Sequence, residues 1–357
     1  MSHDPQHVPV VVNPTGTVSP APQSNQIVGG GRYTLLWLLG EGGTCAVWSA
    51  QDERLGETVA LKFLQPRAGA DPRLLAELRK EALRSRRLAH QNIVQLYDLH
   101  ESPGELPFMI MEYVEGESLH TKRVLDQRQF LTWEFLKPLT LQLCHALEHA
   151  HGEGLVHRDL KPANVMIDKR GRAKLADFGI SAVVNDVYAQ FLALRDTRGT
   201  VTFMSPQQMN GDPASASDDI YALGATLYEL LTSRAPFFSG DINHQVQNVP
   251  PQPIQACQKE LSIENPIPPN VASLIMACLS KDTAGRPPTA WDVAKYIDPN
   301  IGDPIITVRY QPDNAAITAA NMPRGFSREF YIVIGILALL LALTCITLFF
   351  VWKTGIE

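Results

Sequence analysis

Two acids and an amide lie close together in the chain and could bind a metal and handle a proton. Asp159 and Asn164 belong to the run HRDLKPAN, and Asp177 opens the run DFG. The apolar residues around a polar turn at 168–171 predict a strand–turn–strand hairpin, which would gather the three side chains at one rim. Carboxylate and amide oxygens suit Mg2+, and a free carboxylate suits a base. An ordinary polar hairpin rim is the alternative, which two such motifs at this spacing disfavour.

A lysine and a glutamate nearer the N-terminus form a second candidate pair. Lys62 interrupts an apolar strand pattern at 58–64, and Pro72 follows a capping Asp71 at the predicted start of a helix. One stripe of this otherwise basic helix carries Leu74, Leu78, Glu81, Ser85 and Leu88. A carboxylate on the inward face needs a cationic partner, and Lys62 is the expected one. A lysine on an edge strand and a glutamate at a helix boundary are the alternatives.

A glycine-rich turn stands between two predicted strands ahead of this pair. Residues 33–39 alternate as a strand does, GEGGTCAV follows at 40–47, and a second strand is expected at 47–50. Glycines let backbone N–H groups approach phosphates closely. The signal is weak alone, because glycine-rich hairpins are common.

Further elements are expected on both sides of the HRDLKPAN run. Strands are predicted at 90–97 and 108–111, and a buried helix from 131 to 150 that delivers the chain to the run. A second buried helix begins near Asp219, which we expect to tether the run. The proline-rich stretch 249–269 is predicted to be a surface connection.

Composition excludes several classes of protein. The chain of 357 residues is 45% apolar with a formal net charge of -6, which is globular and carries no nucleic-acid signature. Its five cysteines are scattered and lack Cys-x-x-Cys spacing. This argues against a disulfide framework or a zinc site and fits a reducing compartment.

The two ends of the chain differ from its middle. Residues 1–28 are rich in proline and polar side chains, which predicts a disordered tail. Residues 300–328 are expected to be a linker, and 330–352 contain no charge over 23 positions. A helix of that length spans a hydrocarbon core of about 30 Å, so a transmembrane helix is predicted, with a short tail at 353–357. A buried soluble helix is the alternative.

Between Tyr33 and Ile297 the chain resembles the eukaryotic-type serine/threonine protein kinases, and with its single apolar segment it resembles their bacterial membrane-bound members. The HRDLKPAN and DFG runs carry this resemblance. It implies a two-lobed α+β kinase fold at 29–299, followed by one C-terminal transmembrane helix. The β-rich N-lobe extends to about 111, the hinge is 112–116 and the helical C-lobe is 117–299.

The resemblance also implies roles for individual residues. Asp159 would accept the proton of the substrate hydroxyl, with Lys161 typical of kinases that act on serine and threonine. Asn164 and Asp177 would hold Mg2+, with Mn2+ as an alternative ion, while Glu81 pairs with Lys62. The residues expected to contact ATP are Leu39, Gly40, Gly42, Val47, Ala60, Lys62, Met111, Glu112 and Val114.

A regulatory loop is implied between Asp177 and Pro206. In this family the arginine at the position of Arg158 often grips a phosphate on that loop. We expect Thr197 to be autophosphorylated, and Thr200 to form the substrate-facing turn. Dimerisation for phosphorylation in trans is a related expectation.

Two positions depart from the family pattern. Cys45 replaces the third glycine of the glycine-rich turn, which leaves a thiol near the nucleotide. Gln207 replaces a glutamate that normally pairs with an arginine, here Arg286. The second departure concerns the stability of the loop and leaves the chemistry untouched.

The resemblance thus predicts a membrane-anchored serine/threonine protein kinase that transfers the γ-phosphoryl group of Mg·ATP to proteins and binds no nucleic acid. Because ATP is intracellular, the kinase domain should face the cytosol from the plasma membrane. A membrane-tethered pseudokinase scaffold and a small-molecule phosphotransferase of the same fold are the alternatives.

Overall fold

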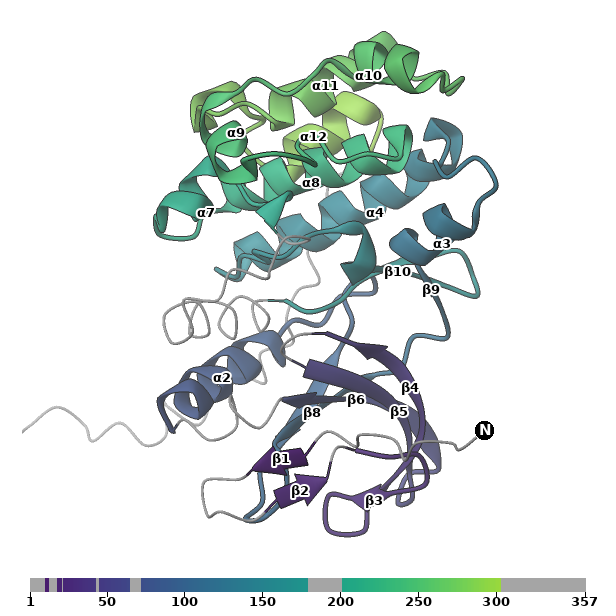
Figure 1. Ribbon diagram of the computed structural model, residues 1–357, viewed down its shortest axis with the longest axis vertical. Helices are drawn as coiled ribbons and strands as arrows, with labels where there is room; N and C mark the ends of the chain where they lie inside the picture. Colours follow the sequence, from purple (N-terminus) through teal and green to yellow (C-terminus); the bar gives the residue numbers. More distant parts are fainter. Residues whose placement is uncertain are drawn as a thin grey trace, which may run out of the picture. The chain divides into compact units, whose positions relative to one another are not determined.

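The computed structural model describes residues 10–12, 18–20, 22–42, 45–64, 72–178 and 201–302 (Figure 1). The predicted linker beyond residue 302, the transmembrane segment and the short C-terminal tail lie outside the described residues. Within those residues no helix is both long and apolar enough to cross a membrane.

The N-terminal part of the fold is a six-stranded antiparallel sheet. In spatial order its strands are β3 (Ile27–Val28), β4 (Tyr33–Glu41), β5 (Cys45–Asp52), β6 (Glu57–Leu64), β8 (Phe108–Glu112) and β7 (Leu96–His100). The strands predicted at 33–39, 47–50, 58–64 and 108–111 are all present.

The sheet has two apolar faces because side chains alternate along each strand. On β6, Val59, Leu61 and Phe63 pack in one cluster with Tyr33 and Phe108. The next residues in the alternation, Ala60 and Leu64, pack in a second cluster with side chains of helix α2 (Pro72–Ser85). Lys62 lies between those two in the alternation, so its side chain belongs to the face that α2 covers.

Helix α2 carries its predicted inward stripe. Leu78, Glu81 and Ser85 are buried, and so is Leu88 just after the helix. Leu83, on the opposite side, is well exposed. The helical period read from the sequence therefore placed Glu81 correctly in the interior.

The strand predicted at 90–97 is shifted. β7 begins only at Leu96, and Ile93 forms an isolated parallel bridge with Leu175. The amide of Val94 donates to the Leu175 carbonyl at 2.9 Å, and the amide of Leu175 donates to the Asn92 carbonyl at 2.8 Å. The first half of the predicted strand 90–97 thus has an extended backbone, but it bonds to Leu175 of the hairpin before Asp177 instead of to the large sheet.

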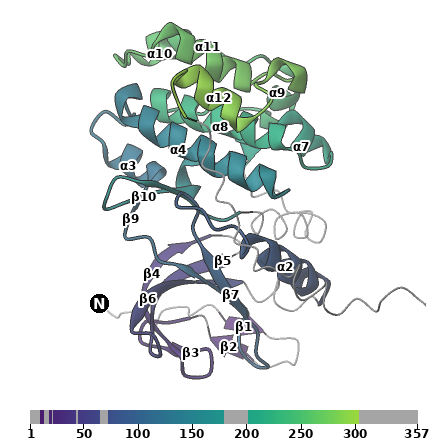
Figure 2. The ribbon, with the colours of Figure 1, turned by 180° about the vertical axis from the view of Figure 1, so that it is seen from behind.

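The C-terminal part is mostly helical. Its helices are α3 (Leu119–Leu125), α4 (Trp133–Gly152), α7 (Pro206–Asn210), α8 (Ala216–Thr232), α9 (Ile242–Asn248), α10 (Ile254–Leu261), α11 (Pro269–Cys278) and α12 (Ala290–Ile297), with 3-10 turns η1 (Pro162–Asn164) and η2 (Thr283–Gly285). α8 is buried along nearly its whole length; α11 packs on α8, and α12 packs on α4 (Figure 2). The stretch 249–269 is not a plain surface connection, because α10 forms within it and buries Ile254 and Cys257.

The predicted catalytic hairpin is present as a small sheet. β10 (Val165–Asp168) pairs with β11 (Ala173–Leu175), and β9 (Gly116–Ser118) adds on the other side. A Cβ on Gly116 would lie 1.8 Å from the Ile167 carbonyl oxygen, so glycine is required where β9 approaches β10. The pair 155–156 before the loop forms no strand.

The segment predicted to be a disordered tail contains paired strands where it is described. β1 (Val10–Val12) and β2 (Val18–Pro20) form a two-stranded antiparallel ladder. β3 pairs with β4, so the larger sheet begins before the predicted boundary at residue 29. The run of β-branched valines favours extended backbone despite the prolines nearby.

Candidate active site

Asp159 is held by two neighbours on its own loop. The side chain is 6% exposed, and Lys161 Nζ lies 2.9 Å from both carboxylate oxygens. Asn164 Nδ2 donates to the main-chain carbonyl of Asp159 at 2.8 Å and to its Oδ2 at 3.0 Å. Asp159 and Asn164 therefore meet, as the sequence predicted, and the carboxylate is fixed from two sides.

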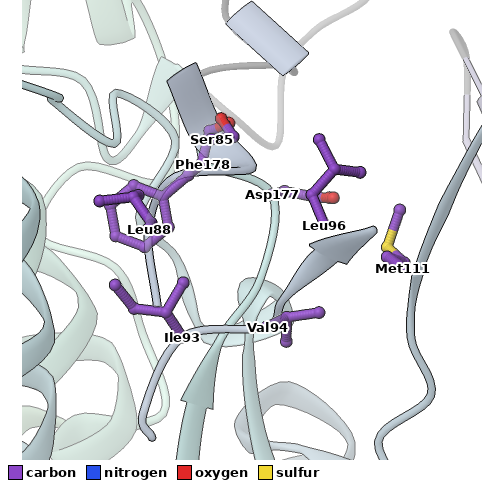
Figure 3. A pocket seen from close by; sticks show the side chains of 8 residues that line it. All are labelled: Ser85, Leu88, Ile93, Val94, Leu96, Met111, Asp177 and Phe178. Atoms are coloured by element: carbon purple, nitrogen blue, oxygen red, sulfur yellow. The ribbon is translucent and has the colours of Figure 1, made fainter. Parts of the chain in front are cut away.

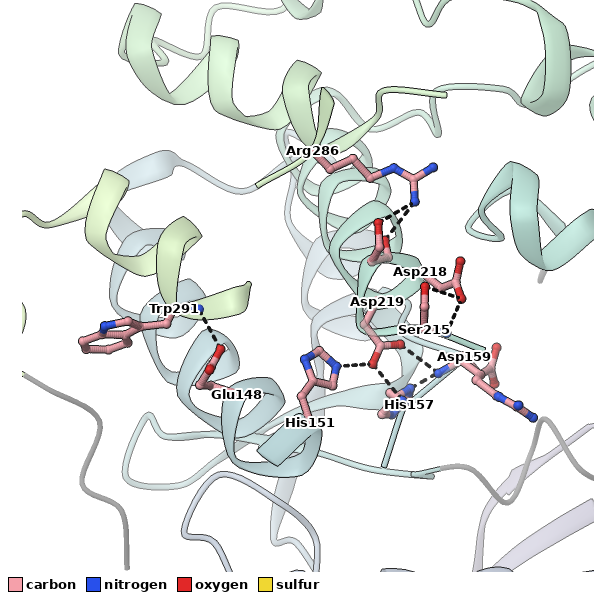
Figure 4. A network of polar contacts seen from close by, with 11 residues as sticks. Glu148, His151, His157, Asp159, Ser215, Asp218, Asp219, Arg286 and Trp291 are labelled. Carbon is pink, nitrogen blue, oxygen red and sulfur yellow. Dashed lines mark hydrogen bonds and ion pairs between the residues drawn. The ribbon is translucent and has the colours of Figure 1, made fainter. Parts of the chain in front are cut away.

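Asp219 holds the backbone that leads to Asp159 (Figure 4). Its two oxygens accept from the amides of His157 at 2.8 Å and Arg158 at 2.9 Å, and His151 Nε2 lies 2.8 Å from Oδ2. Arg158 has a φ of 66°, in the left-handed region that side chains other than glycine rarely adopt. The expected tether is therefore confirmed, and it stabilises a strained turn one residue before the carboxylate.

The ring of His157 links the two motifs. Its Nδ1 accepts from the amide of Asp159 at 3.2 Å, so Nε2 carries the proton and donates to the Ala176 carbonyl at 2.7 Å. The ring also meets Phe178 edge to face, with centroids 4.6 Å apart. One buried imidazole therefore positions both the loop of Asp159 and the loop of Asp177.

Lys62 and Asp177 form a buried ion pair. The Lys62 ammonium, 3% exposed, lies 2.7 Å from Asp177 Oδ1. Burial alone would lower the pKa of Lys62, but the Asp177 carboxylate and the nearby Cys45 and Asp159 raise it above its ordinary value. For Asp177 burial opposes ionisation, and the Lys62 charge nevertheless holds the pKa of the carboxyl below its usual range. Both groups stay charged at neutral pH.

Glu81, the partner expected for Lys62, is also buried. Only 8% of the residue is exposed, and Arg84 NH1 lies 3.6 Å from its Oε2. The Lys62–Glu81 pair stays a prediction. α2 is joined to the second motif by another contact, since Ser85 Oγ donates to the Phe178 carbonyl at 3.3 Å.

Oxygen donors suitable for a hard cation lie beside the Asp159 carboxylate. Asn164 directs its Nδ2 protons at Asp159, so its Oδ1 remains as a possible metal ligand. The Asp177 carboxylate is the second possible ligand. The described residues contain no group of three or more His, Cys, Asp or Glu that could hold a metal ion. Two protein oxygens fit Mg2+, which keeps several waters and shares substrate phosphates.

Several residues expected to contact ATP lie on the face of the sheet that carries Lys62. Ala60 and Met111 belong to the apolar cluster of that face, and Val47 packs against it. Leu39 and Gly40 lie near the end of β4, and Leu39 is 43% exposed. The amide of Gly42 donates to the Cys45 carbonyl at 2.9 Å, and this bond joins the two sides of the glycine-rich turn.

The predicted hinge begins at a well-anchored residue. The amide of Glu112 donates to the Gln95 carbonyl at 2.8 Å, and its carboxylate accepts from the Gln95 amide at 3.1 Å and pairs with Lys174 at 2.5 Å. Val114 follows in the connection between β8 and β9. These contacts fix the backbone just before the residues expected to meet the adenine edge.

A pocket that sequence reasoning missed opens between α2 and the DFG run (Figure 3). It is lined by Ser85, Leu88, Ile93, Val94, Leu96, Met111, Asp177 and Phe178. Met111 was expected to contact ATP, whereas the other lining residues come from the stretch 85–96 and from the DFG run. Their periodicity indicated burial, and it carried no signal that they share one cavity.

Gln207 does meet Arg286, as predicted. Gln207 Oε1 accepts from Arg286 NH2 at 2.7 Å, and Gln207 Nε2 donates to the Lys281 carbonyl at 3.0 Å. Arg286 is 4% exposed, and burial lowers the pKa of its guanidinium despite the charge of Asp218 nearby. Thr197 and Thr200 lie outside the described residues.

Comparisons with known proteins agree with this geometry. The family model described as protein kinase domain matches residues 33–296. A probable serine/threonine-protein kinase of Streptomyces coelicolor is 37% identical over 71% of this chain, and the serine/threonine-protein kinase PknB of Mycobacterium leprae is 34% identical over 76%. The chain covers only 37% and 44% of the length of these relatives. The solved kinase domain of Mycobacterium tuberculosis PknI shares the fold, with a TM-score of 0.62, 24% identity and coverage of 78% of this chain and 98% of that one.

Proposed function

Because the chain belongs to the protein kinase family, we propose that it transfers the γ-phosphoryl group of ATP to serine and threonine hydroxyls of proteins. The observation that supports this most is Asp159, held by Lys161 and Asn164 next to the Lys62–Asp177 pair. A base, a cation for phosphate and two metal-ligating oxygens then lie within one site.

In this proposal Asp159 receives and orients the attacking hydroxyl. Its carboxylate accepts the hydroxyl proton as the bond to the γ-phosphorus forms and the bond to the leaving ADP oxygen breaks. Lys161, at 2.9 Å from Asp159, adds a positive charge close to the transferred group. Lys62 is the cation for the α- and β-phosphates, and it would exchange part of its contact with Asp177 for them.

Asn164 and Asp177 are the residues that would hold the divalent ion. A divalent ion held by these two residues would supply positive charge that offsets the negative charge of the phosphate groups. Mn2+ has similar ligand preferences and stays an alternative. The protein's own part is to keep both donor oxygens fixed. Hydrogen bonds to Asp159 hold the Asn164 side chain, and the ion pair with Lys62 holds the Asp177 carboxylate.

The pseudokinase and small-molecule alternatives predict different outcomes in one assay. Purified chain, Mg2+ and radiolabelled ATP are incubated with a generic protein acceptor and, separately, with a metabolite mixture. We expect label on protein serine or threonine, identified by mass spectrometry. Binding of ATP without transfer would support the scaffold, and label on metabolites alone would support the small-molecule enzyme.

Regulation by phosphorylation is part of the proposal. Thr197 lies between Arg195 and Arg198, and a phosphate on it could pair with Arg158. The same mass spectra should then contain phosphorylated Thr197. Dilution of the enzyme should slow this labelling if it occurs in trans between two copies.

We propose that residues 330–352 anchor the kinase to the plasma membrane with its catalytic part in the cytosol. The support is the uncharged 23-residue stretch with aromatic residues at both ends. Deleting 326–357 should move the protein from the membrane fraction to the soluble fraction and preserve phosphoryl transfer. If the protein that lacks residues 326–357 still sediments with membranes, the proposal that 330–352 is the membrane anchor is wrong.

A further inference from the structure

Gln208 makes a contact with the catalytic loop that the mechanism above does not use. Its Nε2 donates to the main-chain carbonyl of Arg158 at 2.7 Å. Gln208 lies on α7, fifty residues further along the chain, and immediately follows the Gln207 that pairs with Arg286. The sequence offered no signal for this contact, because nothing in a periodic pattern joins α7 to the HRDLKPAN run.

The Arg158 carbonyl belongs to the peptide group that precedes Asp159. On the other side of this peptide group, the amide of Asp159 donates to His157 Nδ1 at 3.2 Å. Asp219 holds the amides of His157 and Arg158, but it cannot hold a carbonyl. Gln208 therefore supplies the one kind of contact, a donor to the carbonyl, that Asp219 cannot give.

The backbone at this point needs such support. Arg158 has a φ of 66°, which a residue with a side chain adopts only when its surroundings fix it. A rotation of the peptide group between Arg158 and Asp159 would swing the Asp159 carboxylate away from Lys161 and Asn164. A donor on its carbonyl opposes that rotation.

α7 is itself fixed from the same part of the fold. Ser205 caps it by accepting from the Gln208 amide at 3.0 Å, and Ser205 Oγ donates to Asp218 Oδ1 at 2.5 Å. Asp218 and Asp219 are consecutive residues at the start of α8. The α8 N-terminus thus positions the catalytic loop twice, directly through Asp219 and indirectly through Ser205 and Gln208.

We propose that Gln208 is a positioning residue for phosphoryl transfer, acting through the Arg158 carbonyl on the Asp159 carboxylate. This inference rests on the proposed kinase function and adds a residue to it.

The test replaces the donor in the full chain with Gln208→Met, which keeps the length of the side chain. We expect kcat to fall about 10–100-fold, because a displaced base loses its alignment, and KM for ATP to change less than about threefold. Gln258→Met is the matched control, since Gln258 Nε2 makes the same 2.7 Å bond to a carbonyl, that of Asn265, far from the site. The two variants should lose similar stability, and the control should keep its kcat.

Gln208→Glu gives a readout that a purely structural role would not move. Its carboxylate cannot donate to the Arg158 carbonyl, but its protonated form can. The ratio of its kcat to that of wild type should therefore rise as pH falls from 8 to about 5.5. A flat ratio, or a Gln208→Met variant within about twofold of wild-type kcat, overturns the inference.

Hydrogen exchange separates this inference from the proposed function. Amides of residues 156–161 should exchange faster in Gln208→Met than in Gln258→Met, whether or not the wild-type chain transfers phosphate. Unchanged exchange of these amides overturns the inference about Gln208, even if the wild-type enzyme is active. An inactive wild type with the expected exchange would instead refute the proposed function alone.

Discussion

Buried charge is concentrated in a few side chains of this site. Lys62 and Asp177 are both charged in the interior, and removing one partner of a buried ion pair costs far more than losing a surface pair. Arg286 differs, because its 2.7 Å partner Gln207 is a neutral amide. A guanidinium that is 4% exposed is thus held by carbonyls, a hydroxyl and an amide.

Gln207→Glu should stabilise the protein by giving Arg286 a carboxylate. The charge of Arg286 already strengthens its bond to Gln207, and a carboxylate at that position adds the attraction between opposite charges. The substitution loses the bond to the Lys281 carbonyl, but Arg286 NH2 also donates to that carbonyl at 3.2 Å. We expect a gain of about 1 kcal/mol, seen by calorimetry as a melting temperature a few degrees higher. A lower melting temperature would mean that the lost amide bond outweighs the new charge.

His90 should make stability depend on pH in the acid range. Burial, with the His149, His145 and Lys174 charges, lowers the pKa of His90 to about 4. Its Nδ1 accepts from the Asn92 amide at 3.1 Å, which requires the neutral ring. The unfolded chain binds the proton first, so this contribution is complete above pH 6.5 and is lost as pH falls towards 4, by about 2 kcal/mol.

The measurement for His90 is the free energy of unfolding in urea between pH 4 and 7. His90→Asn keeps an acceptor without a titrating ring and should flatten the slope. The same substitution at the exposed His244 is the matched control. An unchanged slope in His90→Asn would contradict the assignment.

At the scale of elements, α8 organises the site from the interior. Asp219 holds the catalytic loop, Asp218 holds α7, and a capping box with Ser215 fixes the first turn of the helix. The rest of α8 is largely buried, with α11 packed on it and α10, α3 and α4 also in contact. Close packing of these helices therefore keeps the two aspartates where the loops need them.

Gly224→Ala tests that packing. A Cβ at this position would lie 2.6 Å from Cys278 Cβ on α11, so the helices must separate. Overpacking costs about 1–3 kcal/mol, which exceeds the gain of about 1 kcal/mol in helix propensity. Gly152→Ala in α4 is the control, because its Cβ meets nothing within 4 Å. Urea unfolding should rank Gly224→Ala below wild type and Gly152→Ala at or above it.

The sequence was informative where a pattern repeats locally. Alternation predicted most strands, and the helical period placed Glu81 inside. It indicated that a buried Glu81 needs a cationic partner, but it carried no signal for the ion pair between Lys62 and Asp177, because that contact depends on how distant segments meet. For the same reason it missed Gln208, the pocket beside Phe178 and the shift of β7.

At the scale of the whole molecule, the described part joins a sheet and a helical region through the site itself. Ser85 on α2 bonds to Phe178, the bridge between Ile93 and Leu175 links the region before β7 to the hairpin, and Lys62 pairs with Asp177. Each of these contacts ends at or next to the DFG run. A change in the relation of the two regions must therefore move a residue proposed to bind the metal.

Replacing Asp159 with asparagine is the most direct test of this account. Asp159→Asn keeps the shape and the neighbouring Lys161 and Asn164, and it removes the carboxylate that accepts the proton. We predict that kcat for phosphoryl transfer to a protein acceptor falls about 100–10,000-fold, while Kd for Mg·ATP stays within about threefold and the protein remains folded. A folded Asp159→Asn variant that transfers phosphate at the wild-type rate would contradict the central claim.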